Sequence, residues 1–285
     1  MNIFEYVQKP YKSWLPKNLN RKVTQIDSIE IDLASHCNLN CKGCTHFSPI
    51  AEKWFIDVED FRRDVKRTSE LLPDDYVKRF YILGGEPLLH KDISKMLVIA
   101  REAYKKLPIY IITNGFLLDK MDKAFWDICQ KYNIVIEITK YPVKFDYTKI
   151  KKLIKEQKGK VKIIYKGRTK FLKKKQYKLP IDETGSQDEI YGFTYCHMAG
   201  HCINLAHGHL YTCSYAACMD RFNQYFNKNI PVTEKDGVDI YKNYSTEEVI
   251  RKLTQPIPLC KYCAVKERTY GNEWENSKRD IGEWT

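Results

Sequence analysis

Residues 36–48, HCNLNCKGCTHFS, place three cysteines within eight positions: Cys37, Cys41 and Cys44. They directly follow IDSIEIDLA (26–34), an apolar, β-branched run typical of a buried parallel strand. In a parallel α/β barrel the loops after the strands form the reactive face, so this loop would present its thiolates there. Structural zinc requires four ligands, whereas three thiolates can hold a four-iron cluster whose last iron stays open for another ligand. The loop therefore predicts an iron-sulfur site with a vacant position.

Cysteine usage and the N-terminus bear on this interpretation. The stretch MNIFEYVQKPYKSWLPK has no apolar signal-peptide core, and no apolar run approaches the ~18 residues of a membrane helix. We therefore expect a cytoplasmic protein with no membrane partner, in which thiols stay reduced. Ten cysteines then favour metal ligation over disulfides. A zinc site completed by His36 or His46 is the alternative for the first loop, and Cys129 is expected to be a small buried hydrophobic residue.

The net charge of +12 is concentrated in one segment. Between Lys140 and Lys178, fifteen Lys and one Arg accompany only Asp146 and Glu156, so the rest of the chain is slightly acidic. Such a patch can attract a phosphorylated ligand, an acidic peptide or nucleic acid. The alternative is a solvated lysine-rich surface without a partner.

The first two thirds of the chain alternate between strand-like and helix-like patterns, which predicts parallel strands joined by crossover helices. We predict strands at 26–34, 79–84, 108–114, 133–139 and 160–165, a sixth near 189–195, and helices at 57–72, 92–106, 118–132 and 147–157. This corresponds to a partial (β/α)6 TIM-type barrel. From about Cys196 the alternating pattern ends and cysteines become frequent. We expect a small Cys-rich α+β unit there, with a hairpin around 207–214 and a helix capped by Ser245 and Glu248. The expected division is an N-terminal extension (1–25), the barrel (26–190) and a C-terminal domain (191–285).

The strand ends carry further motifs that resemble the radical SAM superfamily. Cys37, Cys41 and Cys44 match its CxxxCxxC signature, and LGGEP (83–87) is similar to the motif that binds the amino group of S-adenosylmethionine. Thr113-Asn114-Gly115 and Thr139 follow the third and fourth strands, where relatives contact the ribose. The residue before the third cysteine is often aromatic in the family but is Gly43 here, which leaves Phe47 as the candidate to pack on the adenine. The cofactor-binding residues implied are Gly84, Gly85, Glu86, Pro87, Thr113, Asn114, Thr139 and Phe47.

The resemblance implies a [4Fe-4S] cluster with an open iron that holds S-adenosylmethionine. A reduced cluster passes one electron into the sulfonium carbon–sulfur bond, and the resulting 5′-deoxyadenosyl radical abstracts hydrogen from a C–H bond. An electron donor such as flavodoxin or ferredoxin is implied as a partner.

The later cysteines resemble the twitch and SPASM domains that carry auxiliary clusters in this superfamily. A hairpin whose turn contains Gly208 lies between two cysteines, and a cysteine pair follows. Six late cysteines are too few for a full SPASM domain, so one auxiliary [4Fe-4S] cluster is expected. Its expected ligands are Cys196, Cys213, Cys260 and Cys263, with Cys202 as the substitute and Cys218 structural. A zinc module built with the nearby histidines is the alternative.

Three hypotheses about the function remain open. The first is a small polar carbohydrate or cyclitol, phosphorylated or nucleotide-linked to suit the basic patch, that is dehydrogenated or epimerised. The second is peptide modification, although the 25 residues before the first strand are too few for a leader-binding module. The third is a non-catalytic zinc or iron-sulfur protein that binds nucleic acid, which is disfavoured because aromatic residues are not interleaved with the basic ones. Residues beside the strand-end motifs are nominated as catalytic: His46, His90, Glu137, Lys140 and Tyr141.

Overall fold

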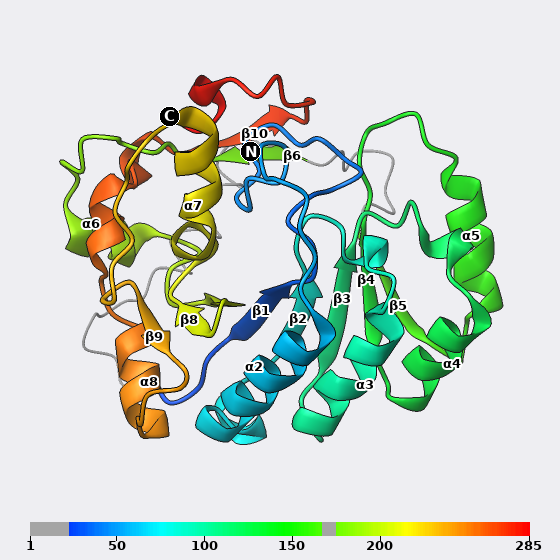
Figure 1. Ribbon diagram of the computed structural model, residues 1–285. Coiled ribbons are helices and arrows are strands. Elements are labelled where there is room, and N and C mark those ends of the chain that lie inside the picture. Colours follow the sequence, from blue (N-terminus) through cyan, green and yellow to red (C-terminus); the bar gives the residue numbers. More distant parts are fainter. Residues whose placement is uncertain (1–22, 167–174) are drawn as a thin grey trace, which may run out of the picture.

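The computed structural model describes residues 23–166 and 175–285, which are organised around one open eight-stranded sheet (Figure 1). The strand order is β5-β4-β3-β2-β1-β7-β8-β9, and a separate two-stranded sheet pairs β10 with β6. Strands β1 to β5 and β7 pair in parallel, whereas β8 pairs antiparallel with both of its neighbours, β7 and β9. The strands are β1 (Ser28–Asp32), β2 (Phe80–Leu83), β3 (Ile109–Thr113), β4 (Val135–Thr139), β5 (Lys162–Lys166), β6 (Lys175–Lys178), β7 (Cys202–Ala206), β8 (His209–Tyr211), β9 (Gly237–Asp239) and β10 (Thr269–Glu273). The predicted incomplete α/β barrel is confirmed.

Strand β1 shows how the sequence positions the site. All five of its residues are buried, and side chains along a strand alternate between its two faces. Ile29 and Ile31 belong to the larger hydrophobic core. Ser28, Glu30 and Asp32 therefore lie on the opposite face of the strand, inside the curved sheet.

Four crossover helices connect the first five strands and lie along one side of the sheet in Figure 1. Asp57 and Asp122 cap α2 and α4 by accepting bonds from backbone amides of the first turn. Ser245 and Glu248 form the predicted capping box. The helices are α2 (Val58–Leu71), α3 (Ile93–Ala103), α4 (Lys123–Lys131), α5 (Tyr147–Glu156), α6 (Glu189–Tyr195), α7 (Ser214–Phe226) and α8 (Thr246–Leu253), with short 3-10 turns at Asp74–Tyr76, Pro87–Leu89, Leu118–Lys120, Pro258–Tyr262, Val265–Glu267 and Ile281–Glu283.

One predicted strand is wrong. Residues 189–195 form helix α6, because the Asp188 side chain accepts bonds from the amides of Ile190 and Tyr191 and starts a helical turn. The sixth parallel strand is instead β7, which pairs with β1 on the side away from β2. β7 continues into β8 through a turn at His207 and Gly208, so the predicted hairpin is confirmed.

The C-terminal part both extends the main sheet and builds a second hydrophobic core. This core gathers residues between Leu179 and Trp284, together with Phe47 and Ile50 from the loop after β1. The first three-cysteine loop is therefore packed against the C-terminal half. The division of the chain at residue 190 stays a prediction, and residues 1–22 of the expected N-terminal extension lie outside the described residues.

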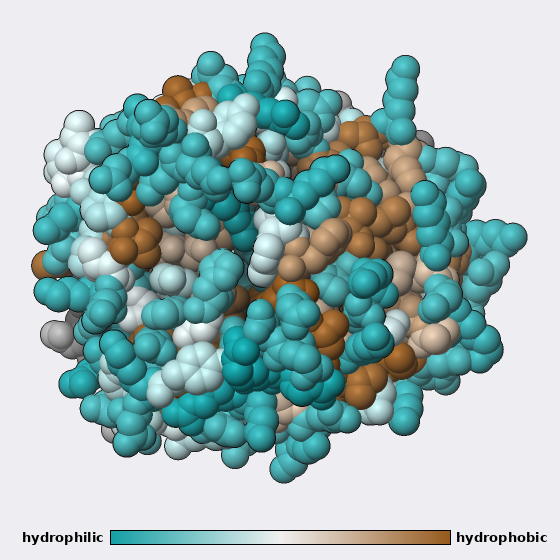
Figure 2. All heavy atoms as spheres, in the orientation of Figure 1, coloured by the Kyte–Doolittle hydropathy of each residue, from teal (hydrophilic) through white to brown (hydrophobic). Residues whose placement is uncertain are grey.

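Hydrophilic side chains cover most of the face seen in Figure 2, with smaller hydrophobic groups between them. Within residues 23–166 and 175–285, no helix has the length and apolar character needed to cross a membrane. The lysines of the predicted basic patch that fall on α5 are exposed, while Tyr147 and Ile150 face the core. Residues 167–174 of that patch lie outside the described part of the chain.

Candidate active site

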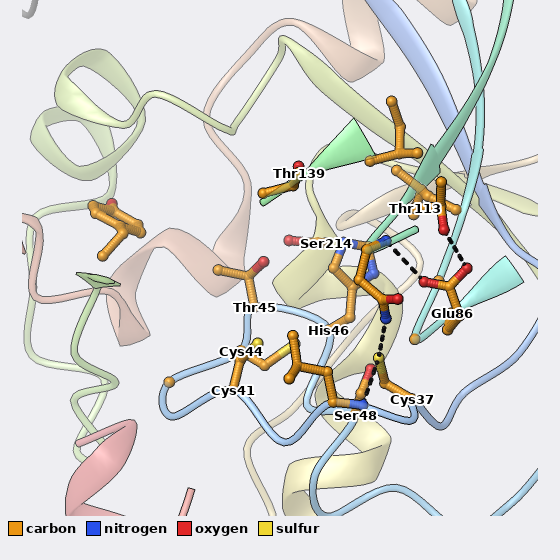
Figure 3. Close-up of a pocket in the computed structure, with 18 of the residues that line it drawn as sticks. Cys37, Cys41, Cys44, Thr45, His46, Ser48, Glu86, Thr113, Thr139 and Ser214 are labelled. Atoms are coloured by element: carbon orange, nitrogen blue, oxygen red, sulfur yellow. Dashed lines mark hydrogen bonds between the residues drawn. The ribbon is translucent and has the colours of Figure 1, made fainter. Parts of the chain in front are cut away.

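A cavity of about 580 Å³ lies at the carboxyl ends of β1 to β4 (Figure 3). The loop after β1 contributes all three early cysteines, the loops after β2 and β3 contribute the GGE motif and Asn114, and the last residues of β3 and β4 contribute Thr113 and Thr139. Residues from β7, the start of α7 and the C-terminal segment complete the wall. The structure thus brings these predicted residues into one place: Cys37, Cys41, Cys44, Gly84, Gly85, Glu86, Thr113, Asn114 and Thr139.

The Glu86 carboxylate is held by a set of hydrogen bonds at the cavity wall. It accepts from the Thr113 hydroxyl at 2.6 Å, from the amide of Asn114 at 3.0 Å and from the amide of Leu88 at 3.2 Å. Burial raises the pKa of Glu86 to about 7 despite these bonds. A bound ammonium group would favour the ionised carboxylate, so the environment suits a cationic ligand group.

The glycine motif is fixed by direct backbone contact with the start of the cysteine loop. The amide of Gly85 donates to the carbonyl of Ala34 at 2.8 Å, and the amide of Glu86 donates to the carbonyl of His36 at 3.1 Å. A Cβ atom on Gly85 would lie 1.9 Å from the His36 carbonyl oxygen, so only glycine fits. Asn114 completes the contact, because its Nδ2 lies 3.7 Å from the Cys37 sulfur.

The C-terminal segment clamps the same loop, a feature that the sequence did not reveal. The amide of Lys42 donates to the carbonyl of Glu275, and the amide of Ser277 donates to the carbonyl of Asn40. The indole of Trp284, which is fully buried, donates to the carbonyl of Cys44 at 3.0 Å. These contacts join residues more than two hundred positions apart, so no local sequence pattern could have predicted them.

Phe47 does not lie at the cavity wall, contrary to its predicted role beside the adenine. Its side chain is fully buried in the second core, against Tyr215, Phe222 and Trp284. The backbone of Phe47 has a φ of 52°, which turns the side chain away with the loop. Among the described residues, the aromatic rings at the cavity are those of Tyr141, Tyr177 and Trp274.

The nominated catalytic residues divide into two groups. His46 and Tyr141 line the cavity, and burial raises the pKa of the Tyr141 phenol well above its usual value. His90, Glu137 and Lys140 are not among the lining residues: His90 bonds the carbonyl of Ile56 at 2.8 Å, and the Lys140 ammonium lies over the Tyr147 ring. Pro87 is also outside the wall, where it starts a buried 3-10 turn.

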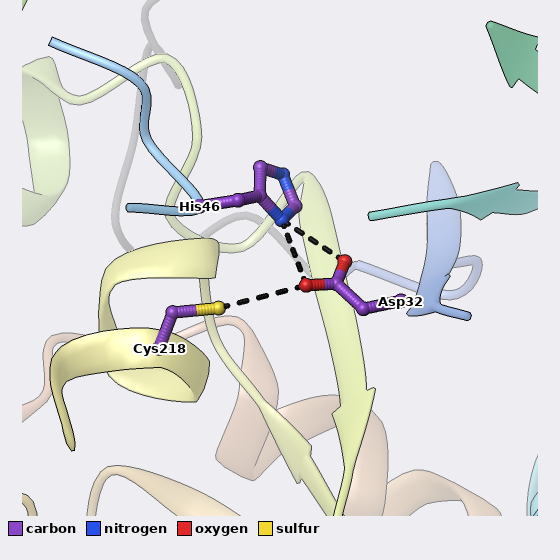
Figure 4. A group of neighbouring side chains, drawn as sticks. All are labelled: Asp32, His46 and Cys218. Carbon is purple, nitrogen blue, oxygen red and sulfur yellow. Dashed lines mark hydrogen bonds and ion pairs between the residues drawn. The ribbon is translucent and has the colours of Figure 1, made fainter. Parts of the chain in front are cut away.

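His46 belongs to a buried group with Asp32 and Cys218 (Figure 4). His46 Nδ1 lies 3.0 Å from Asp32, and Arg221 donates to the same carboxylate at 3.0 Å and to the carbonyl of His46 at 2.8 Å. Burial would raise the pKa of Asp32, but His46 and Arg221 lower it to about 2. Because Arg221 already pairs with this carboxylate, the group serves to hold the His46 ring at the cavity wall.

Four of the late cysteines line a second, small and mostly apolar cavity: Cys196, Cys213, Cys260 and Cys263. They come from the end of α6, the start of α7 and the turn Pro258–Tyr262 with its following residue. Burial raises the pKa of each of these thiols, to about 12 for Cys260. Cys202, the predicted substitute, lines the first cavity instead. The donor set fits a second cluster held by four thiolates.

A family model described as the Radical SAM superfamily matches residues 31–167. GTP 3',8-cyclase of Helicobacter pylori (strain ATCC 700392 / 26695) is 33% identical over 100 residues, which are 34% of this chain and 30% of that enzyme. The enzyme of the same name from Aliarcobacter butzleri is 28% identical over 106 residues, 36% of this chain and 32% of its own length. The chain thus spans about a third of the curated relatives that it matches.

A solved structure resembles most of the chain. The structure of BtrN in complex with AdoMet and 2-DOIA aligns with 84% of this chain and 93% of its own, with a TM-score of 0.50 and 19% identity. At this identity the likeness shows a shared fold. Since 84% of the chain is longer than the part that the family model matches, the likeness extends into the C-terminal half.

We predict that Gly85→Ala disrupts the site. The added Cβ would meet the His36 carbonyl, so we expect a loss of about 3 kcal/mol in the free energy of unfolding and poor iron retention after reconstitution. Gly159→Ala is the control, since its Cβ meets nothing within 4 Å and only its φ of 83° opposes the change. Denaturant unfolding with iron analysis measures both, and equal losses in the two variants would contradict the close contact.

Phe47 is predicted to act in stability rather than in cofactor binding. Phe47→Ala should cost about 3–5 kcal/mol, because it empties a fully buried position. Phe47→Leu keeps most of the volume and should cost about 1 kcal/mol. Calorimetry with S-adenosylmethionine on reconstituted Phe47→Leu should give the wild-type affinity, whereas a tenfold loss would restore the adenine-stacking role.

Proposed function

We propose, from the premise that residues 31–167 of this chain are a radical SAM domain, that the protein is an oxidoreductase or epimerase acting on a small carbohydrate or cyclitol. The observation that supports this most strongly is the meeting of three cysteine side chains and one buried carboxylate at a single cavity. The carboxyl ends of parallel strands are where α/β barrels place their reactive groups.

Each part of the first cavity has a proposed role. Cys37, Cys41 and Cys44 hold a [4Fe-4S] cluster, and Glu86 receives the amino group of S-adenosylmethionine. When bound, the cluster and S-adenosylmethionine together supply one-electron cleavage and a radical able to abstract hydrogen from carbon. Thr113 and Asn114 orient the Glu86 carboxylate, and Thr139 faces the same space from β4. An electron donor such as flavodoxin or ferredoxin supplies the reducing electron.

The second cavity is proposed to hold one auxiliary cluster on Cys196, Cys213, Cys260 and Cys263. Support comes from their shared position around one small space and from the burial of Cys196, Cys213 and Cys260. Cys202 is left out of this set because its side chain faces the first cavity. The C-terminal residues from about 191 onward then act as the auxiliary domain.

The substrate class rests on the shape of the first cavity and on the structural neighbour. About 580 Å³ is in the range of small-molecule sites, and the wall carries several hydroxyl, carboxyl and imidazole groups. BtrN, whose fold this chain shares, binds 2-DOIA together with AdoMet. A nucleotide-linked substrate is the second candidate, favoured by the sequence match to GTP 3',8-cyclases.

Replacement of Cys41 tests the first cluster. Cys41→Ala should abolish release of 5′-deoxyadenosine under reducing conditions and lower the iron content from about eight to about four per chain. Cys129→Ala is the matched control, because Cys129 is buried in the main core away from both cavities. Chromatography of the products and iron analysis measure the two quantities, and retained 5′-deoxyadenosine release would contradict the assignment.

The auxiliary site makes a different prediction. Cys260→Ala should also lower the iron content to about four per chain, while cleavage of S-adenosylmethionine in the absence of substrate continues. Cys218→Ala is the comparison, since Cys218 lies beside Asp32 and outside the second cavity, and should keep about eight irons. A full iron content in Cys260→Ala, or stoichiometric zinc in the wild-type protein, would remove the auxiliary cluster.

A further inference from the structure

Glu30 is a buried carboxyl group that the proposed cofactors do not use. It lies in the middle of β1, opposite Asn204 of β7, and lines the same cavity as the early cysteines. Only 8% of the residue is exposed. Its hydrogen bonds come from the Ser28 hydroxyl, at the long distance of 3.4 Å, and from the thiol of Cys202, which is a weak donor.

The described basic groups of this cavity do not pair with Glu30. Lys42 pairs with Glu275 at 2.7 Å, and His46 pairs with Asp32. Burial lowers the pKa of His197 to about 4, so this imidazole is neutral at neutral pH. Within the described part of the chain, Glu30 forms no ion pair, and burial raises its pKa accordingly. A cation brought by a ligand would offset the cost of burying this carboxylate.

Two hydroxyl groups in the same cavity also lack good protein partners. Ser48 is 6% exposed, and its hydroxyl has no hydrogen-bond partner in the structure. Among the described residues, the Ser214 hydroxyl contacts the sulfur of Met198 at 3.8 Å, which is a poor acceptor. Buried polar groups are normally satisfied, so unpaired ones at a cavity wall indicate a ligand that bonds with them.

We propose that Glu30 binds a protonated amine of the substrate, which is therefore an amino sugar or aminocyclitol whose hydroxyl groups reach Ser48 and Ser214. This inference rests on the proposed function and narrows its substrate class. A phosphorylated substrate fits less well, because the described cavity wall offers Lys42 and His46 only as members of existing ion pairs. A carboxylate–ammonium bond is worth roughly 1.5–3 kcal/mol, or about a 10- to 100-fold preference over a neutral group.

Binding of matched sugars tests the proposal. Calorimetry on the reconstituted enzyme with S-adenosylmethionine should show glucosamine binding at least tenfold more tightly than glucose or glucose 6-phosphate. Glu30→Gln should abolish this preference and keep the affinity for S-adenosylmethionine. Glu59→Gln, an exposed change on α2, should keep both. A preference below threefold in the wild-type protein, with undetectable binding of all three sugars counted as no preference, overturns the proposal, as does a preference that survives in Glu30→Gln.

A second measurement needs no ligand. If the role of Glu30 is to bind a ligand, the free protein bears the cost of burying its carboxylate without a cation. Glu30→Gln removes this cost and should raise the Tm by about 2–4 °C. A Tm lowered by that amount would show that Glu30 is a structural partner of Ser28 and Cys202 and would overturn the proposal. Failure of the proposed function itself would be seen separately, as absent iron or absent binding of S-adenosylmethionine in the wild-type protein.

Discussion

The site depends on the backbone contact between the start of the cysteine loop and the glycine motif. Residues 34–36 offer carbonyl groups to the amides of Gly85 and Glu86, which places the Glu86 carboxylate beside Cys37. This contact is possible only because β1 and β2 are adjacent and parallel, so that their following loops leave the sheet together. If Cys37 binds a cluster and Glu86 an ammonium group, as we propose, the two groups are held together before any cofactor binds, which would lower the ordering cost of binding.

The first half of the fold could be predicted because its signals are local. Five β-branched runs gave five parallel strands, and capping residues such as Asp57 and Ser245 marked helix starts correctly. The strand near 189–195 was wrong because a capping Asp188 outweighed the aromatic, strand-like composition of EIYGFTY. The true sixth parallel strand, β7 (Cys202–Ala206), pairs with β1 (Ser28–Asp32) although residues 33–201 lie between them, and such distant pairing leaves no local signal in a single sequence.

In the candidate site, too, features with a local sequence signal were predicted and features that depend on distant contacts were not. Motifs at strand ends were brought together as expected, since parallel strands present their carboxyl ends at one edge. Phe47 was misplaced because its left-handed backbone turns it into the second core, a conformation that residue type alone does not indicate. Glu30, Ser48 and Trp284 were not predicted as site residues, because their roles depend on contacts with residues far away in the sequence. The sequence had ranked Cys202 behind the four second-cavity cysteines, and the structure places it at the first cavity instead.

Two hydrophobic cores meet at the cysteine loop, since Phe47 and Ile50 anchor it in the C-terminal half while Leu33 belongs to the main core. The cysteine loop therefore contacts both halves of the protein, and its position depends on how each half packs. In the proposed function, Cys37, Cys41 and Cys44 hold a cluster with one open iron that takes S-adenosylmethionine as its remaining ligand. Electron paramagnetic resonance of the anaerobically reconstituted, dithionite-reduced protein tests it most directly. The account predicts a [4Fe-4S] signal whose g-values shift when S-adenosylmethionine is added, and a signal unchanged by that addition would contradict it.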